Sequence, residues 1–178
     1  VGSELRGLTS IRGANDSFPA VQALRQLAGE VKAILGPQTQ ISYAADWSEY
    51  FGYHTEDHVY FNMDPLWADP AIDFIGIDNY MPLSDWRDGS DHADAAWGDI
   101  YNRDYLYANI AGGEGFDWYY ADEAAAAAQI RTPIQDPYYG EPWVFRVKDI
   151  RGWWGNSHHE RIAGLRQDSP TAWIAGSK

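Results

Sequence analysis

The sequence predicts an α/β fold in which parallel strands alternate with helices. A helical stretch precedes a strand at 40–45, and a second strand follows at 72–77 after a long aromatic loop. The second strand is almost entirely apolar, as is typical of a parallel sheet covered on both faces. Polar residues follow both strands, so we expect a ligand site at their carboxyl ends. Periodicity alone leaves open whether the sheet is an open, doubly wound sheet or a closed barrel.

The first helix is expected between Pro19 and Gly36. Asp16 or Ser17 can cap it, Pro19 suits its first turn, and Gly36-Pro37 ends it. Its apolar positions recur at helical spacing: Val21, Leu24, Leu27, Val31 and Ile34.

The two strands are expected to deliver polar and aromatic residues to one edge of the sheet. The strand at 40–45 leads directly to Asp46 and Trp47. The strand at 72–77 leads to Asp78, Asn79 and Tyr80. We therefore expect these side chains to form part of the ligand site.

The second half of the chain is expected to be mainly helical and then irregular. A helix is predicted over 93–111, closed by Gly112-Gly113, and a shorter helix over 124–130. The inward-facing candidates of the longer helix are Ile100, Tyr101, Tyr105, Leu106 and Ile110. A short strand is predicted at 144–147, and the stretch 152–178 reads as irregular apart from a turn of helix.

Composition excludes several classes of protein. The chain has 178 residues, consistent with one domain, and no apolar run approaches the roughly 20 residues that span a bilayer. The formal net charge of −13 disfavours binding to nucleic acid. The absence of cysteine excludes disulfides and thiolate metal sites, and no secretory segment is visible.

Aromatic residues are abundant and often stand beside polar ones. The nine Trp, twelve Tyr and six Phe include Trp47, Trp118 and Trp153, each in a polar or glycine-rich setting. Rings of this kind suit a surface that contacts sugars, whose faces are apolar and whose edges carry hydroxyls. The alternative is that these rings only pack the core and the long loops.

Other motifs do not predict a cofactor or metal site. Adjacent His158 and His159 point in different directions, and the sequence lacks the His-Glu-x-x-His spacing of a zinc site. The run 57–64 lacks the spacing of a calcium loop. Gly112-Gly113-Glu114-Gly115 follows a helix rather than a strand, so it reads as a helix stop and not as a phosphate cradle. We expect no cofactor.

Several long runs carry a specific family resemblance. They are GSELRGLT (2–9), YAADWSEYFGYH (43–54), DPLWADP (64–70), FIGIDNYMPLSDWR (74–87), GGEG (112–115), YYGEPWVF (138–145) and WW (153–154). With these runs the chain resembles the TIM-barrel-like domain of gene transfer agent and phage tail proteins over essentially its whole length. That family in turn resembles retaining glycoside hydrolases with a (β/α)8 barrel.

The resemblance implies positions in the barrel and roles for individual residues. It places Glu4, at the end of the fourth strand, as the acid/base residue. The residues alone leave two readings of Glu4, a general acid with Arg6 as a structural or electrostatic neighbour, or an ordinary solvated charge. The resemblance places 43–47 on the fifth strand and 78–80 on the sixth. The sequence departs from the glycosidase pattern at Ser3, where those enzymes usually have Asn. The residues expected to contact saccharide are Tyr43, Asp46, Trp47, Asp78, Asn79, Tyr80, Trp118 and Trp153.

The resemblance also implies that residues 1–178 form a portion of a TIM barrel, about strands 4 to 6, with no internal boundary. The nucleophilic glutamate of the family lies on a strand that follows the Ser-Lys pair at 177–178. A retaining mechanism needs two carboxyls about 5 to 5.5 Å apart, so this piece alone is expected to be inactive. A whole barrel takes about 250 residues. A partial barrel would expose apolar strand edges and tend to self-associate.

The expected function follows from the resemblance and has alternatives. The intact protein is expected to hydrolyse or bind a cell-envelope polysaccharide, in contact with other tail proteins, in the tail of a phage-like particle assembled in a bacterial cytoplasm. One alternative is a non-catalytic carbohydrate-binding module of the tail hub, and another is a purely structural spacer.

Overall fold

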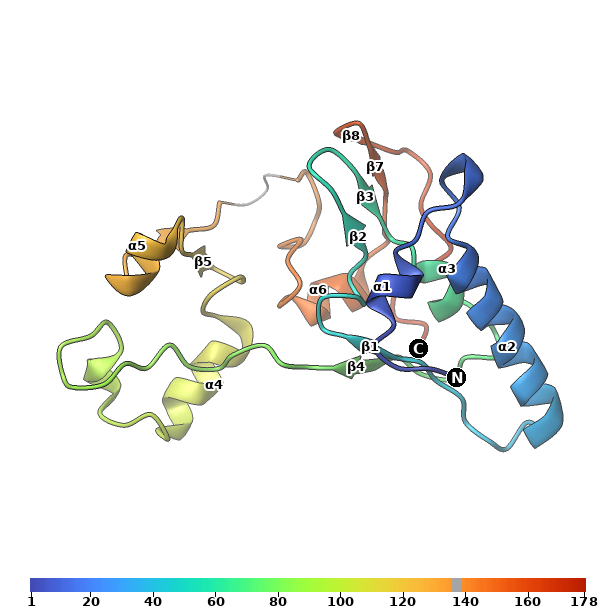
Figure 1. Cartoon of the computed structure of the whole chain (residues 1–178). Helices are drawn as coiled ribbons and strands as arrows, with labels where there is room; N and C mark the ends of the chain where they lie inside the picture. The colour runs from blue at the N-terminus through green and yellow to red at the C-terminus, as the bar shows by residue number, and fades with distance from the viewer. Residues whose placement is uncertain (136–138) are drawn as a thin grey trace. The chain divides into compact units, whose positions relative to one another are not determined.

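The computed structural model describes residues 1–135 and 139–178 and divides the chain into two compact units (Figure 1). The first unit consists of Val1–Asn79 and Trp154–Lys178, and the second of Tyr80–Trp153. Residue 138, the first of the run 138–145, lies outside the described residues. The structure is of mixed α/β type, and the residues that it describes form no closed barrel.

Three parallel segments lie side by side in the first unit. Strand β1 (Ala44–Asp46) pairs in parallel with β4 (Gly76–Asp78), with Asp46 opposite Asp78. On the other side of β1, Ser3 forms a parallel bridge with Ala44, and the Glu4 amide donates to the Ala44 carbonyl at 2.8 Å. The carboxyl ends of all three segments therefore meet at one edge, as predicted for the two strands.

Both strands are shorter than predicted because a side chain replaces part of the ladder. The Asp73 carboxylate accepts from the Ile41 amide at 2.6 Å, while the Asp73 amide donates to the Ile41 carbonyl at 2.8 Å. The Ser42 hydroxyl donates to the Phe74 carbonyl at 2.7 Å. Regular pairing begins at Gly76, where a Cβ would lie 3.0 Å from the Tyr43 carbonyl oxygen, so the close approach of the strands requires glycine.

Helix α2 (Pro19–Leu35) confirms the first predicted helix. It begins with proline in its first turn and ends at Gly36, whose φ of 82° lies in the left-handed region. Val21, Leu24 and Ala28 are buried, and the helix packs on the one-turn helices α1 (Arg6–Thr9) and α3 (Asp64–Trp67). Two apolar positions of the predicted stripe, Leu27 and Ile34, are instead exposed. A 3₁₀ turn, η1 (Ala14–Asp16), precedes α2.

A small antiparallel sheet completes the first unit. Its strand order is β2 (Tyr53–His54), β3 (Val59–Tyr60), β7 (Arg161–Ile162) and β8 (Leu165–Arg166). The prediction that 152–178 is irregular is therefore wrong for β7 and β8. They form a hairpin whose two loop residues, Ala163 and Gly164, both have positive φ, as a type I′ turn requires. Alanine at the first loop position is a weak signal for this turn, and strands of two residues have no visible periodicity.

A buried polar cluster ties the C-terminal segment to α3. His158 and Asp64 are fully buried, and the His158 Nδ1 lies 2.8 Å from an Asp64 carboxylate oxygen. The Thr171 hydroxyl donates to the same oxygen. His158 stacks between Phe61 and Trp173, at ring-centroid distances of 4.4 and 5.6 Å. His158, the first residue of the His-His pair considered above for metal binding, is therefore part of the core.

The second unit contains short helices and strands joined by long connections. Its helices and strands are η2 (Ala95–Trp97), α4 (Arg103–Ala111), β5 (Trp118–Tyr119), α5 (Glu123–Ala127), β6 (Thr132–Pro133) and α6 (Ile150–Gly155). The last two residues of α6 belong to the first unit. Strands β5 and β6 pair antiparallel. The predicted helix 93–111 is interrupted after η2 at Gly98, with φ of 82°, and resumes where the Asn102 side chain caps α4. Of its predicted inward residues only Tyr105 is buried.

Two further predictions in this unit need correction. The predicted helix 124–130 is the shorter α5, capped by the Asp122 carboxylate and ended before Gln129, which has a φ of 49°. The predicted strand 144–147 is absent from the described residues of this segment. There Phe145 has a φ of 60°, and the Val144 amide donates to the Asp149 carboxylate rather than to a neighbouring strand.

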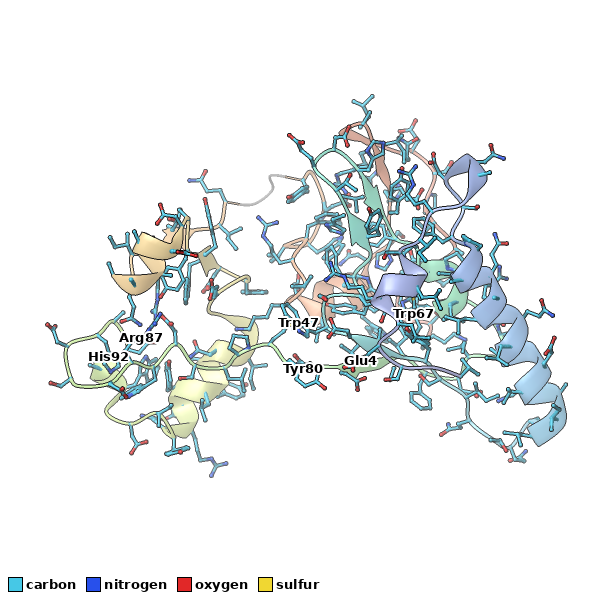
Figure 2. All side chains as sticks on the ribbon, in the orientation of Figure 1. Glu4, Trp47, Trp67, Tyr80, Arg87 and His92 are labelled. Carbon is cyan, nitrogen blue, oxygen red and sulfur yellow. The ribbon has the colours of Figure 1, made fainter. Side chains whose placement is uncertain are left out.

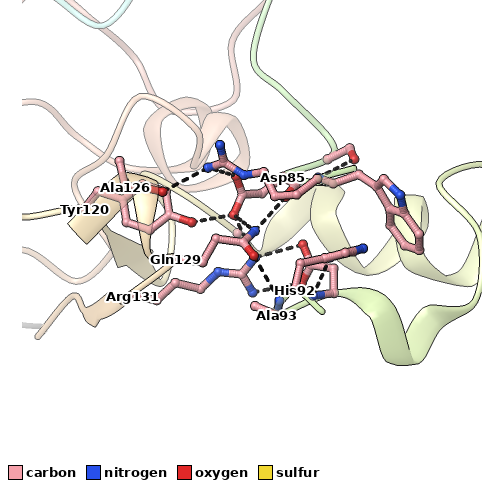
Figure 3. Close-up of polar contacts among 12 residues, drawn as sticks. Asp85, His92, Ala93, Tyr120, Ala126, Gln129 and Arg131 are labelled. Atoms are coloured by element: carbon pink, nitrogen blue, oxygen red, sulfur yellow. Dashed lines mark hydrogen bonds and ion pairs between the residues drawn. The ribbon is translucent and has the colours of Figure 1, made fainter. Parts of the chain in front are cut away.

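Ion pairs and hydrogen bonds occupy the centre of the second unit (Figure 3). The Arg131 guanidinium donates to Asp85 at 2.9 Å and to both oxygens of Asp94, at 2.9 and 2.8 Å. The Tyr120 hydroxyl donates to Asp85, and the Tyr105 hydroxyl donates to Asp94 at 2.8 Å. Across the described residues of both units, no helix is long and apolar enough to cross a membrane.

Candidate functional site

Glu4 lies at the strand-end edge of the first unit, immediately after the Ser3 bridge (Figure 2). Its side chain is exposed and makes no hydrogen bond or ion pair with any described residue. Its φ is 51°, in the left-handed region that costs a residue with a Cβ roughly 1 kcal/mol or more. A strained backbone that presents an unpaired carboxylate is typical of a functional position.

Buried groups hold the backbone that carries Glu4. The amide of Leu5 donates to the Tyr43 hydroxyl at 2.8 Å, and that hydroxyl donates to Glu49 at 2.8 Å. The Thr9 hydroxyl of α1 donates to the same Glu49 oxygen at 2.5 Å. Tyr43, Glu49 and Thr9 are all buried. The residue after Glu4 is thus fixed to the interior of the unit.

Tyr43 is buried and does not lie at the surface where we predicted a contact with ligand. Its exposed fraction is 0 %, so the ring offers no surface to a ligand. Burial, opposed by the hydrogen bond from Leu5 and reinforced by Glu49, raises the pKa of the Tyr43 hydroxyl above its ordinary value. The hydroxyl therefore stays protonated, and we reassign Tyr43 from ligand contact to support of Glu4.

Asp46 and Trp47 follow β1 into a tight turn. The Asp46 carboxylate accepts from the Ser48 amide at 2.8 Å and from the Ser48 hydroxyl, which itself accepts from Arg6 at 3.1 Å. The Trp47 amide donates to the Asp78 carbonyl at 3.1 Å. The Trp47 side chain is half-buried, which leaves part of the indole accessible (Figure 2). Asp46 is engaged in the turn, whereas Trp47 offers an apolar surface.

Asp78 and Asn79 end the neighbouring strand. The Ser3 hydroxyl donates to Asp78 at 3.2 Å, which links the first and third parallel segments through side chains. Asp78 is half-buried and Asn79 is exposed. The strand-end cluster therefore consists of Ser3, Glu4, Trp47, Asp78 and Asn79, all from the first unit.

The other three predicted residues belong to the second unit. Tyr80 is 67 % exposed. Trp118 is half-buried, with the Arg131 guanidinium 4.3 Å from its ring centroid and Tyr120 against its edge. Trp153 is 1 % exposed within α6, so it too is reassigned from ligand contact to the interior.

Sequence reasoning missed Glu49 and Ser48. Glu49 reaches back to the Asp46 amide at 3.3 Å, three residues before it, while Asp46 binds the Ser48 amide. An acid followed three residues later by Glu is the pattern of a capping box, so a local signal was present. The role of Thr9 had no such signal, because its contact with Glu49 joins residues 40 positions apart.

The chemistry of the strand-end cluster is that of one free carboxyl beside an aromatic surface. Glu4 can exchange a proton with a bound ligand, and Trp47 can pack against a sugar face. Asp46 and Asp78 already accept hydrogen bonds from the chain. No group of three or more potential metal-binding side chains occurs in the part of the chain that the structure describes.

Comparison with known protein families places the whole chain in one family. The family model of the GTA TIM-barrel-like domain matches residues 1–178. The chain belongs to this family. The family resemblance inferred from the sequence is therefore confirmed. Among curated proteins, none matches the chain.

Proposed function

We propose that this GTA TIM-barrel-like domain binds a polysaccharide of the cell envelope at the strand-end cluster. The observation that carries the proposal is the free, exposed Glu4 carboxyl on a strained backbone, at the same strand ends as the half-exposed Trp47. Ligands of α/β folds with parallel strands bind at this edge. The three parallel segments would correspond to strands 4 to 6 of the barrel.

In the intact protein Glu4 would act as the acid/base of a retaining hydrolysis. Its carboxyl would give a proton to the glycosidic oxygen as a second carboxylate attacks the anomeric carbon, and would then take a proton from the water that releases the sugar. The buried Tyr43–Glu49 pair supports the proposal because it fixes Leu5, the residue that follows the acid.

A non-catalytic role is the second candidate, as a carbohydrate-binding or structural module of a phage-like tail hub. The observation that favours it is that Asp46 and Asp78 are both engaged, by Ser48 and by Ser3. Each of these carboxylates already accepts hydrogen bonds from the chain, whereas Glu4 accepts none from a described residue. In both candidates the partners are envelope polysaccharide and other tail proteins, in the tail of a phage-like particle.

Binding is tested first, by calorimetric titration of the chain with purified envelope polysaccharide. Trp47→Ala is expected to weaken binding about tenfold, since stacking on an aromatic ring contributes on the order of 1–2 kcal/mol. Trp154→Ala is the matched control, because Trp154 is a partly exposed Trp of the same unit outside the strand-end cluster. Equal losses for both variants would contradict the proposed site.

Hydrolysis is tested separately, by release of reducing ends from the same polysaccharide in the intact protein. Glu4→Gln is expected to abolish release and to retain binding, because glutamine keeps the shape of the side chain and cannot give up a proton. Binding without any release, in both the natural protein and the variant, would favour the non-catalytic candidate.

A further inference from the structure

One cavity of the first unit shares no residue with the strand-end cluster. Its volume is about 460 Å³, and it lies between the first two turns of α2, the segment that joins β3 to α3, and the chain around β7 and β8. Small-molecule sites typically occupy about 300–1,000 Å³. The cavity is therefore large enough for one or two sugar rings.

The lining combines an apolar wall with polar side chains that have donors or acceptors free for hydrogen bonds to a ligand. Phe18, Val21 and Phe61 are buried lining residues that supply the apolar part. Gln22 and Ser169 make no side-chain hydrogen bond with described residues, and Gln167 uses only its NH₂ group, on the Leu165 carbonyl at 2.9 Å. Apolar walls with a few polar groups are typical of sites that bind small polar molecules.

One charge in the lining has no partner of opposite sign. Asp16 is paired with Arg12, and Arg25 with Asp69 at 3.1 Å. Glu160 forms no ion pair with a described residue. Burial, together with the nearby Asp64 carboxylate, raises the pKa of Glu160, against a hydrogen bond from the Phe61 amide. A positive charge brought into the cavity would stabilise the ionised Glu160.

A metal ion does not suit this position. The described residues contain no group of three potential metal-binding side chains, and one oxygen of the nearby Asp64 already accepts hydrogen bonds from His158 and Thr171. A single carboxylate beside an apolar wall suits an organic ammonium group, because its three N–H donors can be shared between the carboxylate and neighbouring polar groups while its carbon skeleton packs on the wall. The free amide and hydroxyl groups around it suit ring hydroxyls, which a simple diamine lacks.

We propose that this cavity binds a hexosamine with a free amine, the ammonium group against Glu160 and the ring hydroxyls against Gln22, Gln167 and Ser169. The proposal rests on the proposed function only in taking a saccharide as the class of ligand. It adds a second site, with its own specificity for a charged amino sugar, to the site at Glu4.

The experiment titrates the chain with D-glucosamine and with N-acetyl-D-glucosamine, followed by protein NMR. The two sugars differ in the charge on nitrogen, so glucosamine is expected to bind at least tenfold more tightly and to shift the signals of residues around the cavity. Glu160→Gln is expected to remove that preference, since it keeps the shape and removes the charge. Glu30→Gln, an exposed position of α2 outside the cavity, is the matched control and should leave it unchanged.

Each other outcome overturns the proposal. Equal binding of the two sugars, no binding of glucosamine, or an unchanged preference in a folded Glu160→Gln variant would show that the cavity is not an amine site. Cadaverine, a simple diamine, binding as tightly as glucosamine would overturn the assignment to a sugar.

Glu4→Gln and Trp47→Ala should leave glucosamine binding intact, so failure of the strand-end proposal and failure of this one are distinguishable. Gln22→Ala, an exposed position, should weaken glucosamine a few-fold without affecting the fold.

Discussion

Buried side chains in the first unit are mostly aromatic and aliphatic, whereas the centre of the second unit is a set of ion pairs. The first unit encloses Tyr43, Tyr60, Phe61, Trp67 and many smaller apolar residues. The buried apolar residues described in the second unit are Tyr105, Trp143, Phe145 and Trp153. Burial of apolar surface is insensitive to pH and tolerates relaxed geometry, while a network of charges depends on every member. We therefore expect the first unit to unfold when apolar contacts are lost, and the second when its charges are changed.

The largest expected effect is the loss of Trp67 from the first unit. Trp67 is fully buried, with its ring 5.9 Å from that of Tyr43 in an edge-to-face arrangement. Trp67→Ala should lower the free energy of unfolding of this unit by about 3–5 kcal/mol, through lost burial and the cavity left behind. Hydrogen exchange, read separately for peptides of each unit, is the measurement. Trp154→Ala, at a partly exposed site, should cost about 1 kcal/mol or less.

The corresponding change in the second unit is the removal of a charge. Arg131→Met removes the cation that Asp85 and Asp94 share and leaves Asp85 with Arg87 alone. Because the network is partly exposed, the loss should destabilise this unit by about 2 kcal/mol, between the values for exposed and buried pairs. Arg25→Met, which breaks an exposed pair with Asp69, should cost less than about 1 kcal/mol. Urea unfolding, with exchange read by unit, compares the two. Similar effects of both variants would mean that the network does not stabilise the second unit.

Low pH should destabilise the second unit more than the first. Burial disfavours the charged forms of Asp85 and Asp94, but hydrogen bonds from Tyr120 and Tyr105, and from Arg131 to both, lower their pKa below the ordinary value. Because the unfolded chain binds these protons first, the stability they contribute is present above about pH 4 and is lost as the pH falls below it. Protection of the second unit against hydrogen exchange, relative to the intrinsic exchange rate at each pH, should therefore fall over this range.

In the first unit, two carboxyls change the pH dependence of stability in opposite directions. Burial raises the pKa of Asp64, against hydrogen bonds from His158 and Thr171, so protonation of this group favours the folded state as the pH falls. The hydrogen bond from Lys32 lowers the pKa of Asp73, which has the reverse effect. Partial cancellation should leave the first unit less sensitive to acid than the second. Equal acid sensitivity of the two units would contradict this comparison.

The same difference explains what the sequence could predict. Helix α2 and the strand ends at Asp46 and Asp78 were predictable, because periodic apolar residues between Pro19 and Gly36 define the helix and short apolar runs define the strands. The predicted cap at Asp16 or Ser17 is wrong, since no side chain caps the helix. The network of the second unit was not, since Arg131 meets Asp94 across 37 positions and no local pattern encodes that contact. The burial of Tyr43 was equally difficult to predict, because a tyrosine in a strand beside a ligand site can contact either the ligand or the core.

The smallest expected effect concerns backbone strain, and it sharpens the comparison most. In the second unit, Gln129 and Phe145 have positive φ, and their side chains contribute to the structure, through contacts with Asp85 and by burial. Glu4 has a positive φ of 51°, yet its side chain is exposed and unpaired, so the fold gains nothing visible from it. Glu4→Gly should therefore stabilise the first unit by about 0.5–1 kcal/mol, measured by thermal unfolding, while removing the proposed acid.

The same change to glycine at Phe145 should destabilise the second unit, because the loss of a buried ring outweighs the relief of strain. A destabilised Glu4→Gly variant would show that Glu4 has a structural role that its contacts do not reveal. A stabilised one would mean that the chain retains a conformational cost at this position for the chemistry of an exposed carboxyl, as residues selected for function rather than stability do.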